Sequence, residues 1–202
     1  MHALQFSNLS RADGSVIFST GETVIQAAAY GPTEIKISKE LYDKAAIEVI
    51  FNPKVGQSGC EERVIENFVR SSLEPMIIKE LHPRSSITVI IQEMQNAGNL
   101  LACCVNAAYL AVLDAGIPLR GSIAAVSIDL SDDKLTPFNS SKEKEAQSCT
   151  VCITNEMKIN GIKSSFFLTK ETIEKCIKTA QSSAENIFKM YRDGCTKRYN
   201  SK

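Results

Sequence analysis

The sequence lacks several features that mark common classes of protein. Lysine plus arginine number 23 and aspartate plus glutamate also number 23, so the 202-residue chain has no formal net charge. A protein that coats nucleic acid by bulk electrostatics usually has a basic excess, so only a local basic surface is open to this chain. No apolar run could span a bilayer, and residues 1–10 lack the pattern of a signal peptide. We therefore expect no membrane partner.

The short motifs of several enzyme classes are also missing. Histidine occurs only at His2 and His82, and no sequence signature places either beside a nucleophile. Neither the G-x-x-x-x-G-K-S/T loop nor the G-x-G-x-x-G loop is present. The apolar fraction of 44% is enough for one well-buried core. We expect a single domain over residues 1–202.

The seven cysteines are an odd number, which favours free and mostly buried thiols in a reducing compartment. Cys149 and Cys152 have the C-x-x-C spacing of some zinc and redox sites. They fall in an expected strand, however, where an offset of three places them on opposite faces. Zinc would also need two more thiols or imidazoles. We expect core packing here, with no metal and no cofactor.

The periodicity of apolar residues predicts an α+β fold, in which helices pack on mixed sheets. Gly31-Pro32 is expected to stop the second strand, and Pro75 to kink the first helix or end its regular part. Asn99 is expected to cap the central helix, which is apolar on nearly all sides. The tail from Lys197 to Lys202 should be frayed. The expected strands are 15–19, 23–30, 46–51, 86–94, 122–130, 146–154 and 157–167, and the expected helices are 61–81, 99–115 and a last helix from 169.

Four segments, taken in order, resemble the RNase PH family. They are R-x-D-G-S at 11–15, G-x-T with Y-G-P at 21–32, the helix containing Glu62-Arg63, and the central helix ending L-D-A-G-I-P at 113–118. The resemblance implies the RNase PH-like fold, also called the ribosomal protein S5 domain 2-like fold.

Three further segments resemble, within this family, the ring subunits of the eukaryotic RNA exosome: 81–89, 100–104 and 141–146. The resemblance implies three kinds of partner. These are other RNase PH-like exosome ring subunits, exosome cap proteins, and single-stranded RNA threading the ring. It also implies location in the nucleus and nucleolus, and in the cytoplasm.

Active family members split RNA from its 3′ end with inorganic phosphate, and hold that phosphate in a Gly-Thr-Arg type turn. The matching residues here are Gly98, Asn99 and Leu100. The helix N-terminus that follows supplies about half a charge. Leucine cannot replace a bidentate guanidinium on phosphate. The resemblance therefore implies a degenerate phosphate site.

The family's catalytic aspartate matches Gln147 or Ser148, neither of which is anionic. Glu143 and Glu145 lie nearby in an expected loop and could serve only if that loop folded inward. We therefore expect no catalytic residues, no enzymatic activity and a structural role in RNA processing. The alternative is a homodimeric nuclease acting on RNA or DNA outside the exosome, because these losses do not oppose every hydrolytic route. A homo-oligomeric phosphorolase is opposed strongly by both losses.

Basic side chains are the remaining candidates for RNA contact. Arg63 starts the first long helix, where the family contacts RNA, and Arg70 lies two turns further along the same face. Lys54 lies in the preceding loop. A simpler interpretation is a solvated helix face with ion pairs such as Glu66–Arg70.

Overall fold

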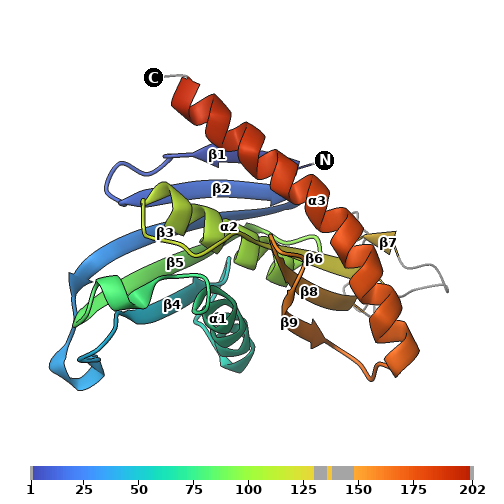
Figure 1. Ribbon diagram of the computed structural model, residues 1–202, viewed down its shortest axis with the longest axis horizontal. Coiled ribbons are helices and arrows are strands. Elements are labelled where there is room, and N and C mark those ends of the chain that lie inside the picture. The colour runs from blue at the N-terminus through green and yellow to red at the C-terminus, as the bar shows by residue number, and fades with distance from the viewer. Residues whose placement is uncertain (1, 130–135, 138–147, 201–202) are drawn as a thin grey trace.

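The computed structural model of the chain describes residues 2–129, 136–137 and 148–200. The elements form four layers, in the order sheet, helix pair, sheet, helix (Figure 1). This arrangement confirms the expected α+β class with helices packed on sheets. None of the helices in the described part of the chain is long and apolar enough to cross a membrane.

The first sheet has five strands in the order β1-β2-β3-β5-β4. All its pairs are antiparallel except β4 with β5, which is parallel. This leaves β1 and β4 as the edge strands. The strand bounds are β1 His2–Phe6, β2 Gly14–Thr20, β3 Thr23–Glu34, β4 Ala46–Asn52 and β5 Ser85–Gln95.

The second sheet is antiparallel and has the order β7-β6-β8-β9. Strand β6 is buried along its whole length because α2 packs on one side of the sheet and α3 on the other. The strand bounds are β6 Ile123–Asp129, β7 Thr136–Pro137, β8 Ser148–Thr154 and β9 Ile159–Ser164.

The helices are α1 Cys60–Leu73, α2 Leu100–Asp114 and α3 Lys170–Asn200, with short 3-10 turns η1 Ile37–Lys39 and η2 Lys79–Leu81. Helix α2 lies between the two sheets, and every residue from 102 to 112 is buried. This confirms that the central helix is apolar on nearly all sides because it is covered on nearly all sides.

Gly31-Pro32 does not stop the second strand, contrary to expectation. Strand β3 continues to Glu34, and the register with β5 shifts between Tyr30 and Thr33. Such an irregularity accommodates proline, which has no N–H. At a bulge the residue does not donate a hydrogen bond to the neighbouring strand, so no bond of the sheet is lost. Beyond it, Thr33 pairs with Ser86.

The first long helix is shorter than predicted. Helix α1 ends at Leu73, two residues before Pro75, and the chain then turns. Ile77 forms a bridge to Leu119, and only a 3-10 turn follows at η2. The proline therefore ends the helix rather than kinking it.

At the chain ends, one prediction was wrong and one strand was missed. Residues 197–200 belong to α3 rather than to a frayed tail. Arg198 there forms an ion pair with Asp114, with 2.8 Å between Nη2 and Oδ1. At the other end, β1 was not predicted, although it pairs with β2 over five residues.

The C-x-x-C pair lies in β8 with its two thiols on opposite sides of the sheet. Cys149 contacts Cys176 of α3, whereas the Cys152 sulfur lies 3.8 Å from the Ser72 hydroxyl of α1. Both cysteines are buried and unbonded to other cysteines. The expected core role is therefore confirmed.

Candidate functional site

The R-x-D-G-S and D-A-G-I-P segments meet in space, and their contacts hold the fold together. The Ser15 N–H donates to Asp114 Oδ2 at 2.9 Å, and the Gly31 N–H donates to Asp13 Oδ2 at 2.9 Å. Gly14 allows α2 to approach closely, since a Cβ there would lie 2.2 Å from the Ala115 nitrogen. These residues therefore have structural roles, and the chemistry must be sought elsewhere.

The turn at Gly98-Asn99, where the family resemblance implies a degenerate phosphate site, is bonded to the start of β3. Thr23 Oγ1 donates to the Gly98 carbonyl at 2.6 Å and accepts from the Ala97 N–H at 3.1 Å. Gly98 and Asn99 both have positive φ, 98° and 57°. Asn99 stands at the N-cap position, but its side chain makes no capping hydrogen bond. The predicted position of the cap is confirmed, but its hydrogen bond is missing because the left-handed backbone of Asn99 differs from the extended backbone of an ordinary cap.

Leu100 is the first residue of α2, and its half-buried side chain packs against the core. At the position where the family resemblance places a guanidinium, the structure therefore has an apolar contact. The buried amide oxygen of Asn99 has no hydrogen-bond partner in the described part of the chain. Among the described residues, the side chains of Asn99 and Leu100 thus offer an anion no cation at this end of α2.

Ser148 lies at the same end of the molecule as this turn. The Asn106 amide exchanges two hydrogen bonds with the Ala125 backbone, at 2.7 and 2.9 Å, and Tyr109 contacts Ser122. Helix α2 therefore runs antiparallel to β6. Its N-terminus points to the end of β6 where Asp129 pairs with Ser148. The fold thus brings Leu100 and Ser148, the two positions that the family resemblance singles out, to one end.

Asp129 is an acidic residue that the sequence analysis missed. It ends the otherwise apolar and hydroxylic strand β6, it is 7% exposed, and it faces Ser148 across the ladder. The sequence did offer a signal, because an aspartate at the end of a strand that is otherwise apolar and buried is unusual. Gln147, Glu143 and Glu145 lie outside the described residues.

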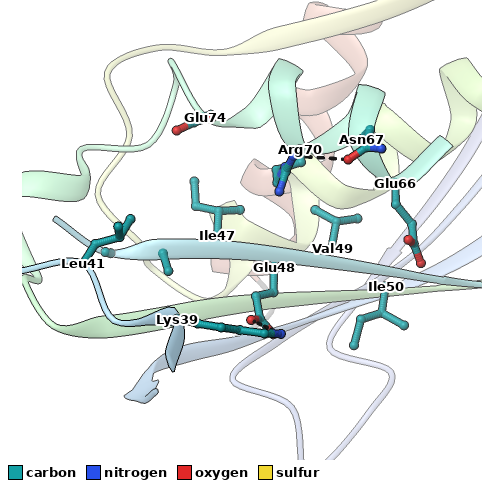
Figure 2. Close-up of a pocket in the computed structure, with 12 residues that line it drawn as sticks. Lys39, Leu41, Ile47, Glu48, Val49, Ile50, Glu66, Asn67, Arg70 and Glu74 are labelled. Carbon is teal, nitrogen blue, oxygen red and sulfur yellow. Dashed lines mark hydrogen bonds and ion pairs between the residues drawn. The ribbon is translucent and has the colours of Figure 1, made fainter. Parts of the chain in front are cut away.

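The basic candidates of α1 are all exposed but have different surroundings. Arg63 follows Glu61 and Glu62 in the first turn, where Glu62 accepts a hydrogen bond from the Gly59 N–H at 2.7 Å. Arg70 lies over β4 and donates to Asn67 Oδ1 at 3.2 Å (Figure 2). Lys54 is exposed in the loop before the helix. The structure therefore places Arg63 in a locally acidic turn and Arg70 beside a sheet edge.

The Glu66–Arg70 ion pair expected from their spacing does not form. Glu66 Oε1 instead accepts a hydrogen bond from the Phe51 N–H of β4 at 2.9 Å. The hydrogen bond from the Phe51 N–H is more favourable for the Glu66 carboxylate than an ion pair with the solvated Arg70 side chain. It is charge-assisted, it satisfies an unpaired donor at the edge of the sheet, and it links α1 to β4.

The buried thiols have no features of a reactive or metal-binding site. Burial raises the pKa of Cys103 and that of Cys152 to about 12, and raises the pKa of Cys149 to about 11. These thiols therefore stay protonated near neutral pH, whereas metals and electrophiles need the thiolate. No group of three or more histidine, cysteine or acidic residues within the described ranges could hold a metal ion.

Comparison with known families finds the 3′ exoribonuclease family, domain 1 (RNase PH), over residues 2–118. Among curated proteins, the rice "Exosome complex exonuclease RRP46 homolog" is 34% identical over 139 residues, 69% of this chain and 58% of that protein. The Pyrococcus furiosus "Exosome complex component Rrp41" is 30% identical over 205 residues, 95% of this chain and 81% of that protein. The matched region spans less than three fifths of the rice relative's length.

Comparison with solved structures supports the same fold over nearly the whole chain. The crystal structure of rice Rrp46 matches with a TM-score of 0.87 and 28% identity, covering 95% of this chain and 93% of that one. A chain of an Archaeoglobus fulgidus exosome with RNA bound to the active site matches with a TM-score of 0.78. Its identity is 15%, so this second likeness concerns the fold alone.

Proposed function

Because the chain belongs to the 3′ exoribonuclease (RNase PH) family, we propose that it is a non-catalytic structural subunit of the RNA exosome ring, of the Rrp46 or exosome component five type. In this role it supports 3′-to-5′ RNA processing and degradation. Its partners are the other RNase PH-like ring subunits, the cap proteins and single-stranded RNA threading the ring. Its locations are the nucleus, the nucleolus and the cytoplasm.

The observation that supports a non-catalytic role most strongly is Leu100, whose side chain packs against the core at the start of α2. Phosphorolysis needs an anionic nucleophile held beside an anionic phosphodiester, which requires cations as well as a helix N-terminus. Ser148, at the position of the family's catalytic aspartate, supplies no carboxylate. Its strand partner Asp129 adds a carboxylate near the N-terminus of α2, but not the cation that would hold phosphate.

The first test is for phosphate-dependent RNA shortening. The purified chain is incubated with single-stranded RNA, inorganic phosphate and magnesium, and nucleoside diphosphates are measured. An active RNase PH enzyme serves as the positive control. We expect no diphosphate release. Release that disappears when Ser148 or Asp129 of this chain is mutated would refute the non-catalytic assignment.

The alternative function, a homodimeric nuclease acting on RNA or DNA outside the exosome, gains one observation. Asp129 places a carboxylate beside Ser148 at the degenerate site, and a carboxylate can bind a metal ion or manage a proton in hydrolysis. This route would release nucleoside monophosphates without phosphate, and Asp129→Asn would abolish the release. The mass of the native particle separates the proposals, since a large complex supports the ring and a dimer supports the nuclease.

RNA contact in the ring is proposed to be electrostatic and independent of sequence, centred on Arg63 with Arg70 or Lys54 as helpers. Phosphate contacts release counterions, so binding should fall steeply as salt rises. The test compares RNA protection by the intact ring with wild-type chain and with Arg63→Glu at two salt concentrations. Equal protection in both rings would make Arg63 an ordinary solvated residue of a helix face.

A further inference from the structure

The outer edge of β4 borders an open space of about 500 Å³ between the strand and α1 (Figure 2). Ile47 and Val49 point toward α1, whereas Glu48 and Ile50 point to the other side of the strand. The edge has an apolar surface as well, because Ile50 and Leu41 are each 40% exposed. Edge strands with free backbone groups are templates for pairing with another extended chain.

The backbone contacts at the two ends of β4 reveal which residues face outward. The Ala45 N–H donates to the Lys79 carbonyl at 3.0 Å, and the Phe51 N–H donates to the Glu66 carboxylate at 2.9 Å. In a parallel pair, alternate residues bond to the neighbouring strand. Because Ala45 and Phe51 bond away from β5, Ile47 and Val49 also present their N–H and C=O groups to the open side. Within the described chain, nothing bonds to those groups from that side.

Among the described residues around this edge, the guanidinium of Arg70 forms no ion pair. Glu48 is paired with Lys39 at 2.8 Å, and Glu74 is paired with Lys79 at 2.5 Å. The hydrogen bond to Phe51 occupies Glu66. Arg70 has only its neutral hydrogen bond to Asn67 and forms no ion pair with the described residues. The edge therefore combines free backbone donors and acceptors, apolar side chains and an available guanidinium.

We propose that the β4 edge, defined as the outward backbone N–H and C=O groups of Ile47 and Val49 together with the Arg70 side chain, is a docking site for an extended polypeptide segment of a partner protein. The segment adds a strand beside β4, and its backbone bonds to Ile47 and Val49. It carries a carboxylate that reaches Arg70 and apolar residues that cover the edge. Glu66 and Lys79 close the two ends, so the site takes a short segment. This proposal is independent of ring membership.

The docking proposal assigns Arg70 to protein recognition and so leaves Lys54 as the helper of Arg63 in the RNA contact proposed above. An RNA surface on α1 would instead use both Arg63 and Arg70. The test uses the purified full chain and a blocked hexapeptide in which valine and threonine alternate around one aspartate. Binding at millimolar peptide is followed by amide NMR. We expect the Ile47 and Val49 amides to shift and their hydrogen exchange to slow on binding. A peptide that leaves both amides unchanged would overturn the proposal.

Reversing the charge of one residue at a time distinguishes the docking site from a nucleic-acid surface more clearly. Arg70→Glu should weaken binding about fivefold, while the matched control Arg63→Glu should leave it unchanged. A peptide with lysine in place of aspartate should prefer the Arg70→Glu chain. Equal weakening by both variants, or stronger shifts of Ile47 and Val49 with single-stranded RNA, would instead favour a nucleic-acid surface and reject the docking site.

A backbone variant tests strand addition directly. Ile47→Pro removes one outward N–H that β4 does not need for its pairing with β5, and proline is tolerated on edge strands. We expect loss of peptide binding with retained circular dichroism. Retained binding by the folded variant would refute strand addition. If the variant fails to fold, the Arg70 and Arg63 comparison still decides the proposal.

Discussion

The two ends of α2 belong to the same buried helix but have opposite chemistry. At the C-terminal end, Asp114 has a side chain that is 1% exposed, accepts from the Ser15 N–H at 2.9 Å and pairs with Arg198 at 2.8 Å. At the N-terminal end, the Asn99 amide oxygen is buried without a hydrogen-bond partner in the described chain, and Leu100 is apolar. At one end a buried carboxylate has an ion pair and a hydrogen bond, whereas the other end has an unpartnered amide oxygen beside an apolar side chain.

The difference separates what the fold needs from what the chemistry needs. The Asp114 junction ties together the start of β2, the end of α2 and the end of α3, which are far apart in the sequence. Without these partners the buried Asp114 carboxylate would be an uncompensated charge, which would lower the stability of the fold. At the N-terminal end, the Thr23 side chain bonds to the turn at Ala97 and Gly98, and the Asn99 and Leu100 side chains form no hydrogen bond or ion pair with the described residues. We therefore expect substitutions at this end to disturb the fold less than substitutions at the Asp114 junction.

The largest expected effect comes from breaking the junction with Asp114→Ala. The change removes the acceptor of the Ser15 N–H and leaves Arg198 without its carboxylate, so we expect a loss of about 3 kcal/mol in unfolding free energy. Urea unfolding measures it. Asp13→Ala is the control, because it removes one exposed hydrogen bond to Gly31 and should cost about 1 kcal/mol. Equal costs would mean that the Asp114 junction is no more important than an ordinary loop contact.

A smaller effect is expected from restoring a cation at the other end with Leu100→Arg. Losing a half-buried leucine contact should cost about 1 kcal/mol of stability, while the new guanidinium should produce measurable binding of inorganic phosphate. Leu101→Arg is the matched control, because it adds the same charge one residue further along a helix and in a different direction. Phosphate binding by both variants alike would show that charge alone, rather than this position, creates the site.

We expect Leu100→Arg alone not to restore phosphorolysis, because Ser148 still lacks a carboxylate. The double variant Leu100→Arg with Ser148→Asp tests this directly in the assay for nucleoside diphosphates. Phosphorolysis by the single variant would show that Ser148 is not a second loss, and the site assignment would have to change.

Most of the fold could be predicted because its elements have strong local periodicity. The burial of Ile87, Val89 and Ile91 follows the alternation of β5, and the all-apolar α2 is the central helix. The errors occur where distant contacts override local signals. Residues 197–200 remain helical where Arg198 reaches Asp114, and β3 passes Gly31-Pro32 because β5 continues to pair with it.

The candidate site was less predictable from sequence than the fold. The family resemblance identified Gly98, Leu100 and Ser148, but only the antiparallel packing of α2 on β6 shows that they share one end. Asp129 was missed because its role depends on its ladder partner. Glu66 was paired with the wrong group because a helix pattern carries no information about the Phe51 N–H.

The smallest expected effect concerns Asn99 and asks whether the N-terminal end needs any polar side chain. Asn99 has a φ of 57°, a conformation that glycine adopts without strain. Asn99→Gly also removes the buried, unpartnered amide oxygen, which offsets the extra entropy of glycine in the unfolded chain. We expect a net stabilisation of about 0.5 kcal/mol by urea unfolding. Asn99→Ala is the control, because it removes the same amide but keeps a Cβ in the left-handed backbone, and it should be about 1 kcal/mol less stable than Asn99→Gly. A loss of stability with glycine as large as that with alanine would show that the amide makes a contact that holds this end, and the contrast between the two ends of α2 would then weaken.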